Sequence, residues 1–402
     1  MDPLQFLPAW PPEATPLGWV AVLLLAAIVA GESVRRFLRI SRVIGYLAVG
    51  ALLGPDAGGM IDSDTASQLR IFVDIAVGML LFELGQRVDL GWLRRNPSLL
   101  AASVLEAALT FMLVYVAMTW FGIGPVTAAA AALLAVATSP AVVMTVIKDL
   151  RAQGQVTERV MLFTALNTAY AVIGLALMVG LLHYESHRPL ATMILHPLYL
   201  VGGSLVLAGV LAMAMLSLLR LFGRRPAFQF SATVSLVLLT VAVATILKLS
   251  VPLSLLLLGA FGRLFDHERH FVSLKFGETA MLFIVLLFAL AGASLEFTGW
   301  STAVPLAFAF VGARLVGKAV PILLLSIPSG LALRKSSLVS LGLMPMSAVS
   351  LLMLHELMRR SPALASEIGP AMFLAIALLA FAGPLALEFT LRRCSEAAEG
   401  TP

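Results

Sequence analysis

The fold is decided by two neighbouring apolar segments, PVTAAAAALLAVATSPAVVMTVIKDL (Pro125–Leu150) and TERVMLFTALNTAYAVIGLALMVGLL (Thr157–Leu182). Each is long enough to cross a membrane, because a transmembrane helix needs about 20 mainly apolar residues. A loop of six residues joins them. This stretch therefore predicts a hairpin of two membrane-spanning helices.

Both segments carry polar residues near their centres. Pro140 interrupts the first, since proline cannot donate to the helical ladder and its ring clashes with the preceding turn. Thr138 and Ser139 are suitable N-caps for a helix that restarts at Pro140. We therefore predict two half-helices that meet near mid-membrane, where irregular backbone survives only if it is buried or lines a cavity. An ordinary proline kink is the alternative. Asn167 and Thr168 lie near the centre of the second segment.

Composition sets the class of protein. Of the 402 residues, 60% are hydrophobic and only 12% are charged, and the mean hydropathy is +0.98. These values indicate a polytopic membrane protein embedded in a lipid bilayer rather than a soluble enzyme. The high pI of about 9.7 does not indicate nucleic-acid binding, because the basic residues are spread over short loops. A single cysteine, Cys394, excludes internal disulfides and thiolate metal clusters, and no cofactor or metal motif is found.

Hydropathy predicts an all-α chain of about thirteen membrane spans. A Pro-rich leader (1–16) precedes the membrane domain (17–392), and a short tail (393–402) follows it. The second and ninth spans are short and glycine-rich. The spans lie near 17–37, 41–54, 68–87, 98–121, 125–148, 157–182, 197–221, 229–248, 251–264, 277–295, 302–327, 336–357 and 365–391.

The loop charges predict the orientation. Of the 27 Lys and Arg residues, twenty fall on one predicted side, five on the other, and Arg314 and Lys318 fall within a span. Cytoplasmic loops are enriched in Lys and Arg. We therefore expect the leader outside and the C-terminal tail in the cytoplasm, in a bacterial-type inner (plasma) membrane.

Several motifs resemble the monovalent cation–proton antiporter superfamily. ATSPAVV (Ala137–Val143) and ALNTA (Ala165–Ala169) are similar to its paired signatures, and RVIGYLAVGALLGP (Arg42–Pro55) is similar to a second-helix signature of its potassium-efflux branch. The sequence departs from the pattern at two positions. Ser139 stands where many members have Asp, and Thr168 stands where the ion-binding Asp is expected.

The segment LGLMPMSAVSLLM (Leu341–Met353) resembles the second broken helix of that superfamily. Pro345 lies in mid-span, with Ser347 close by. The resemblance implies inverted repeats in which the two breaks cross at the bilayer centre. Half-helix N-termini would then face C-terminal carbonyl groups there.

Arg314 and Lys318 are the least expected residues of the eleventh span. They are four positions apart and so share one helical face, within an otherwise apolar segment. An unpaired cation in the membrane is costly, so such residues are functional candidates. Snorkelling to the interface is the alternative for Lys318. Glu106 is the deepest acid in the sequence, and we predict that it pairs with Arg314.

The resemblance implies a secondary transporter that exchanges a monovalent cation, Na⁺ or K⁺, for protons, and a homodimer. Two alternatives remain: a carrier of small anions with the same fold, and a degenerate homologue that serves as a sensor or complex subunit. A regulatory subunit acting in trans is compatible with each. The predicted ion site comprises Thr138, Ser139, Asn167, Thr168, Arg314 and Lys318, supported by Pro140, Pro345, Ser347 and Glu106.

Cysteine labelling tests the predicted topology. In a Cys394→Ser background, a cysteine introduced between positions 183 and 196 should react with a membrane-impermeant maleimide added outside. A cysteine at positions 224–226 should react only after the membrane is opened. Labelling of both from the same side would contradict the span count.

Overall fold

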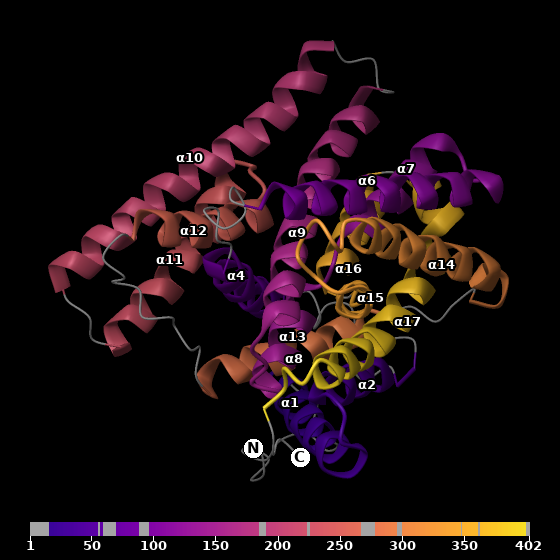
Figure 1. The fold of residues 1–402 in the computed structure, drawn as a ribbon. Coiled ribbons are helices and arrows are strands. Elements are labelled where there is room, and N and C mark those ends of the chain that lie inside the picture. The colour runs from indigo at the N-terminus through magenta and orange to yellow at the C-terminus, as the bar shows by residue number, and fades with distance from the viewer. Residues whose placement is uncertain are drawn as a thin grey trace, which may run out of the picture.

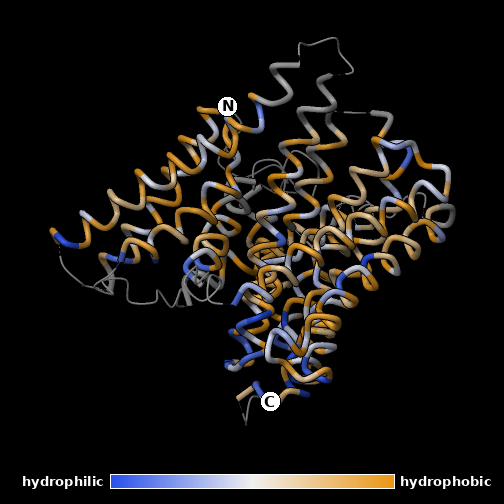
Figure 2. Tube along the Cα trace, turned by 45° about the horizontal axis from the view of Figure 1, so that its top comes forward, coloured by the Kyte–Doolittle hydropathy of each residue, from blue (hydrophilic) through white to orange (hydrophobic). Residues whose placement is uncertain are grey.

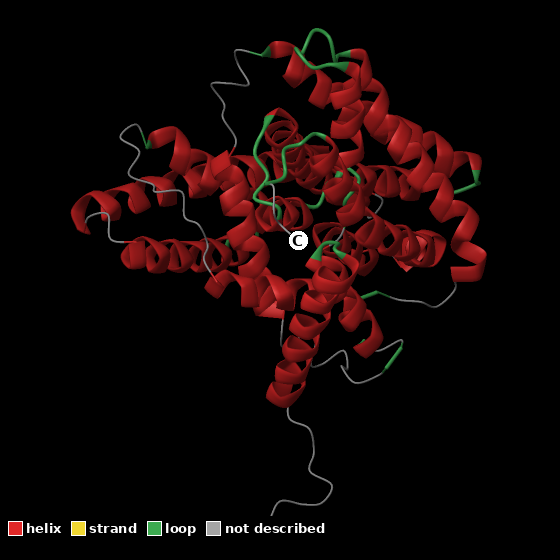
Figure 3. Ribbon diagram, turned by 60° about the horizontal axis from the view of Figure 1, so that its bottom comes forward, coloured by secondary structure: helices red, strands yellow, loops and turns green. Residues whose placement is uncertain are grey.

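The computed structural model describes residues 16–54, 57–58, 70–87, 96–184, 190–222, 226–266, 278–295, 300–346, 348–360 and 362–398. These residues are almost entirely helical and contain no strand (Figure 3). The elements are α1 (Pro16–Ser33), the short π-helix η1 (Val34–Leu38), α2 (Arg42–Leu53), α4 (Arg70–Arg87), α6 (Pro97–Trp120), α7 (Pro125–Val136), α8 (Pro140–Asp149), α9 (Gln155–Tyr184), α10 (Leu190–Phe222), α11 (Pro226–Ile246), α12 (Val251–Phe265), α13 (Glu278–Ala293), α14 (Trp300–Leu324), α15 (Leu333–Gly342), α16 (Ala348–Arg360) and α17 (Pro362–Arg393).

Each of the thirteen predicted spans coincides with a helix or with a pair of consecutive helices. Seven spans among the described residues are long and apolar enough to cross a membrane. The second and ninth spans form the short helices α2 and α12, as predicted. The chain is thus a multi-pass, all-α membrane protein, and hydrophilic segments gather at the end of the molecule that bears the C-terminus (Figure 2).

The helices fall into two groups by their packing, and Figure 1 shows how all of them are arranged. One group packs α6, α7, α9 and α14–α17 together, and the other contains α1, α2, α4 and α10–α13. Among the seven candidate spans of the described residues, α7–α8 is the most deeply buried, because every residue of its most apolar stretch is buried. In α10, only 33% of the residues in the most apolar stretch are buried, so α10 presents most of its surface outward. The polar break between α7 and α8 is therefore enclosed by protein.

The first predicted break is confirmed. Helix α7 ends at Val136 and α8 begins at Pro140, so residues 137–139 are not helical. Ser139 is the N-cap of α8, and its hydroxyl accepts a hydrogen bond from Val142 N at 3.4 Å. The proline kink with a continuous helix is ruled out. Thr138 and Ser139 were both candidate caps, and the structure selects Ser139.

The second predicted break is confirmed as well. It separates α15, which ends at Gly342, from α16, which begins at Ala348, and Pro345 lies within it. Ser347 lies outside the described residues. Ser139 N donates to Pro345 O at 2.9 Å, so the two breaks cross in direct contact.

Two glycines allow the central helices to approach closely. A Cβ on Gly317 of α14 would lie 2.5 Å from the Cα atom of Thr110 on α6. A Cβ on Gly383 of α17 would lie 2.5 Å from the Cα atom of Pro345 in the second break. Real Cβ atoms essentially never approach another atom so closely. Glycine at these positions therefore sets the spacing of the helices around the two breaks, as small residues do in membrane helix pairs.

Alanine at Gly317 should destabilise the protein, whereas alanine at Gly312 of the same helix should not. A Cβ on Gly312 would meet nothing within 4 Å. Gly312→Ala should therefore be neutral or stabilise by up to about 1 kcal/mol through helix propensity. Gly317→Ala forces two backbones apart and should cost about 1–3 kcal/mol. Thermal unfolding in detergent measures both; equal melting temperatures would contradict the close α6–α14 contact.

Candidate functional site

Arg314 of α14 lies at the crossing of the two breaks and is 0% exposed. Its Nε donates to Ala135 O at 3.0 Å, and its Nη2 donates to Ala137 O at 2.8 Å. Nη1 donates to Met344 O at 3.0 Å, and Nη2 also donates to Leu343 O at 3.3 Å. All four acceptors are carbonyls at the C-terminal ends of α7 and α15, which no helical N–H satisfies.

This arrangement stabilises both breaks electrostatically. The C-terminus of a helix carries about half a negative elementary charge. Two such ends converge on one guanidinium, which supplies a full positive charge and a fixed fork of donors. Arg314 thus replaces the missing helical hydrogen bonds of two separate segments at once.

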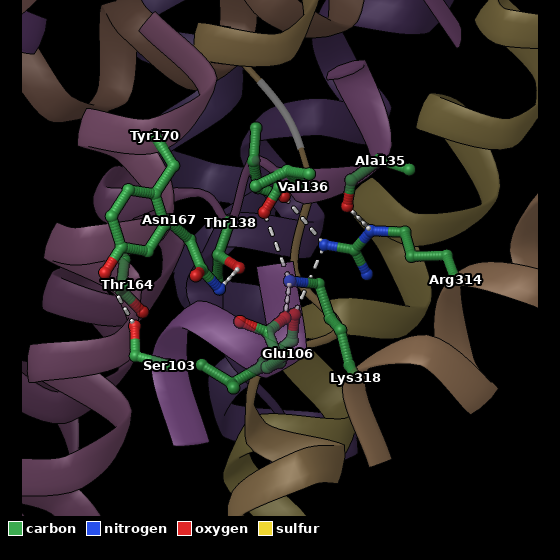
Figure 4. A network of polar contacts seen from close by, with 12 residues as sticks. Ser103, Glu106, Ala135, Val136, Thr138, Thr164, Asn167, Tyr170, Arg314 and Lys318 are labelled. Atoms are coloured by element: carbon green, nitrogen blue, oxygen red, sulfur yellow. Dashed lines mark hydrogen bonds and ion pairs between the residues drawn. The ribbon is translucent and has the colours of Figure 1, made fainter. Parts of the chain in front are cut away.

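Lys318, one turn further along α14, forms an ion pair with Glu106 of α6. Its Nζ lies 2.6 Å from Glu106 Oε1, and it also donates to Val136 O at 3.1 Å. Lys318 is 1% exposed and Glu106 is 0% exposed, so the pair is fully buried. Snorkelling of Lys318 to the membrane interface is therefore ruled out. Together, Arg314 and Lys318 bind three consecutive carbonyls at the end of α7, those of Ala135, Val136 and Ala137; the first two are labelled in Figure 4.

The prediction that Glu106 pairs with Arg314 is wrong. The sequence correctly indicated that Arg314 is buried and that Glu106 has a cationic partner. The partner is Lys318, because its flexible stem reaches across to α6 where Gly317 brings α6 and α14 together. Arg314 is satisfied by backbone carbonyls, and a pattern of side chains cannot reveal such acceptors.

Asn167 and Thr168 of α9 lie beside the first break, as predicted. Asn167 Nδ2 donates to Thr138 Oγ1 at 3.3 Å. The Thr168 hydroxyl lies 2.7 Å from Thr164 O and 3.3 Å from Thr138 O. All of these side chains are at most 1% exposed. The structure thus brings Thr138, Asn167 and Thr168 together, with the Ser139 backbone bonded to the second break.

The sequence did not reveal a contact between α6 and α9. Ser103 Oγ lies 3.4 Å from the hydroxyl of Tyr170. Ser103 is one turn before Glu106, and Tyr170 is one turn after Asn167. This spacing places Ser103 and Glu106 on one face of α6, and Asn167 and Tyr170 on one face of α9. That pattern is the sequence feature from which the contact could have been predicted.

The two predicted prolines lie at the breaks. Pro140 is buried at the first position of α8, and Pro345 contributes its carbonyl to the contact between the breaks.

Other ion pairs lie away from this site, and two of them join a buried glutamate to a different helix. Lys148 of α8 pairs with Glu83 of α4, which is 5% exposed, and Arg35 of η1 lies 3.4 Å from Glu388 of α17. No group of three or more metal-ligating side chains occurs among the described residues. The crossing itself offers hydroxyl, amide and carboxylate oxygens beside the cationic side chains of Arg314 and Lys318.

The family model for the transmembrane sodium/hydrogen exchanger matches residues 20–393. The chain belongs to this family. The match extends from α1 to the end of α17 and so includes both breaks and every residue of the crossing. A comparison with curated proteins found no match.

Two solved structures show the same fold. Both are of the sodium proton antiporter MjNhaP1 from Methanocaldococcus jannaschii, one at pH 8 and one from electron microscopy. The first superposes with a TM-score of 0.67 at 16% identity, and 94% of this chain and 95% of the other are covered. The second superposes with a TM-score of 0.75 at 15% identity, with coverage of 94% and 97%. This member of the exchanger family therefore adopts an antiporter-like architecture.

Double-mutant cycles test the pairing at the crossing. Glu106→Gln and Lys318→Met should each lower the free energy of unfolding by about 3–5 kcal/mol, because each leaves a buried group without its partner. The double variant should recover much of the loss. Arg314→Met combined with Glu106→Gln should show a much smaller coupling energy, because these side chains do not bond each other. Equal coupling energies in thermal unfolding measurements would contradict this assignment.

Proposed function

We propose that this protein is a secondary active transporter that exchanges a monovalent cation, Na⁺ or K⁺, for protons. It acts as a carrier and not as an enzyme. The observation that carries the proposal is the group of buried oxygens at the crossing of two broken helices, beside the Glu106–Lys318 ion pair. Crossing breaks near mid-membrane are where transporters of this architecture bind their ions. Family membership supports the same reaction.

The ion site of this proposal includes four polar residues that were predicted from the sequence, namely Thr138, Ser139, Asn167 and Thr168. Thr138, Asn167 and Thr168 supply neutral oxygens, and Ser139 fixes the backbone of the break. Arg314 acts as the scaffold of the site rather than as a ligand. Glu106, which pairs with Lys318, supplies the negative charge beside these oxygens.

The contacts of Arg314 favour a cation over an anion as the transported species. An anion carrier would need a positive group that is able to bond to its substrate. Every nitrogen of the Arg314 guanidinium already donates to a backbone carbonyl, and Lys318 pairs with Glu106. Binding an anion there would require breaking these buried bonds, each of which is costly to leave unmade.

The rest of the proposal concerns the cellular setting. We place the protein in a bacterial-type plasma membrane, with its N-terminus outside and its C-terminus in the cytoplasm, as the loop charges favour. We also propose a homodimer. A regulatory subunit in trans remains compatible with this arrangement.

Reconstitution tests the proposed exchange. In liposomes with an acidic interior and a trapped pH-sensitive dye, external Na⁺ or K⁺ should raise the internal pH, because protons leave as the cation enters. Choline chloride and protein-free liposomes serve as controls. Asn167→Leu should slow the exchange at least about tenfold, since it removes an oxygen from the site at a cost of roughly 1–3 kcal/mol. A response to anions alone would favour the anion carrier, and no response to any ion would favour a sensor or complex subunit.

A further inference from the structure

Glu106 has one carboxylate oxygen that the ion pair does not use. Oε1 accepts from Lys318, whereas Oε2 is buried and makes no hydrogen bond to any residue that the structure describes. Asn167 is in the same condition: its Nδ2 donates to Thr138, and its buried Oδ1 has no hydrogen-bond partner in the described part of the chain. Buried polar atoms are rarely left unpaired, so each such atom calls for an explanation.

The two oxygens belong to facing surfaces of α6 and α9. One turn from each of them, Ser103 of α6 contacts Tyr170 of α9, so the two helix faces meet. Lys318 provides a second link, because it bonds both Glu106 and Val136, two residues before Thr138. In Figure 4, the free oxygen of Glu106 points away from Lys318, toward the side on which Thr138 and Asn167 lie.

The charges at the crossing leave Glu106 as the anionic ligand. In broken-helix transporters, exposed carbonyls at half-helix C-termini coordinate the transported cation. Here Arg314 and Lys318 already occupy those carbonyls. Thr168 on α9 is neutral. Of the buried carboxylates in the described residues, Glu106 alone is 0% exposed and lies at the crossing; Glu83 and Glu388 pair elsewhere.

We propose that Glu106 supplies the carboxylate that α9 lacks, with Oε2 and Asn167 Oδ1 as ligands of the transported cation. This inference rests on the proposed exchange and names its titrating group. When the cation leaves, a proton from the water-accessible side bonds to Oε2 and gives a neutral carboxylic acid. When the next cation arrives, that proton leaves and the carboxylate binds the cation.

This exchange leaves the charge of the site unchanged. Lys318 keeps its proton in both states, so a bound proton and a bound monovalent cation are electrically equivalent. The other charged or titratable groups facing Glu106 are Arg314 of α14 and Tyr170 of α9, and neither takes part in the proton transfer. The exchange is therefore one proton for one cation and electroneutral.

The test compares two buried glutamates that each pair with a lysine. Glu106→Gln removes the charge but keeps an amide oxygen for Lys318, and Glu106→Gln with Lys318→Met removes both charges and so protects the fold. Both should lower cation-driven proton flux in liposomes at least tenfold. Glu83→Gln, the matched control at the Lys148 pair, should leave the flux within about twofold of the wild type. With equal K⁺ present on both sides throughout, adding valinomycin to clamp the membrane potential should not change the Na⁺-driven wild-type rate.

Cation binding gives a second readout that does not depend on transport. In detergent, Na⁺ or K⁺ should raise the melting temperature of the wild type, more so at high pH, where protons compete less. This shift should vanish in both Glu106 variants and persist in Glu83→Gln. Flux and cation-dependent stabilisation that persist in folded Glu106 variants would overturn the assignment and leave the exchange function intact. A wild type with neither response would overturn both.

Discussion

A single buried guanidinium holds the centre of this molecule together. Arg314 bonds to carbonyls at the ends of two helices that stop in the middle of the protein. Without such donors, the carbonyls would be left unsatisfied in a medium that contains no water to replace them. The breaks, the direct bond between Ser139 and Pro345, and the open oxygens beside them all depend on this interaction.

The electrostatics of the crossing follow from the same arrangement. Two helix C-termini together carry about one negative charge, which balances Arg314. Glu106 balances Lys318. Both fixed cations are thus compensated without a carboxylate at Thr168. The carboxylate at the crossing is that of Glu106 on α6, whereas Thr168 on α9 is neutral.

Much of this architecture could be predicted from the sequence, because proline and hydropathy act locally. Pro140 and Pro345 marked both breaks, and the apolar runs gave every span. The burial of Arg314 followed from its depth in an apolar helix, whereas the sequence left snorkelling open for Lys318. Their partners could not be predicted, because backbone carbonyls have no sequence signature and because the reach of a lysine depends on how closely two helices pack. Glycine at 317 sets that distance, which only the folded chain reveals.

The bonds of Arg314 also constrain how the protein moves. They join α14 to the ends of α7 and α15, and Lys318 adds α6 to the same assembly. Sliding any of these helices past another would break several buried bonds at once, so they must travel as one rigid body. Exposure of the crossing to the opposite side of the membrane then requires displacement along the boundary with the other group of helices.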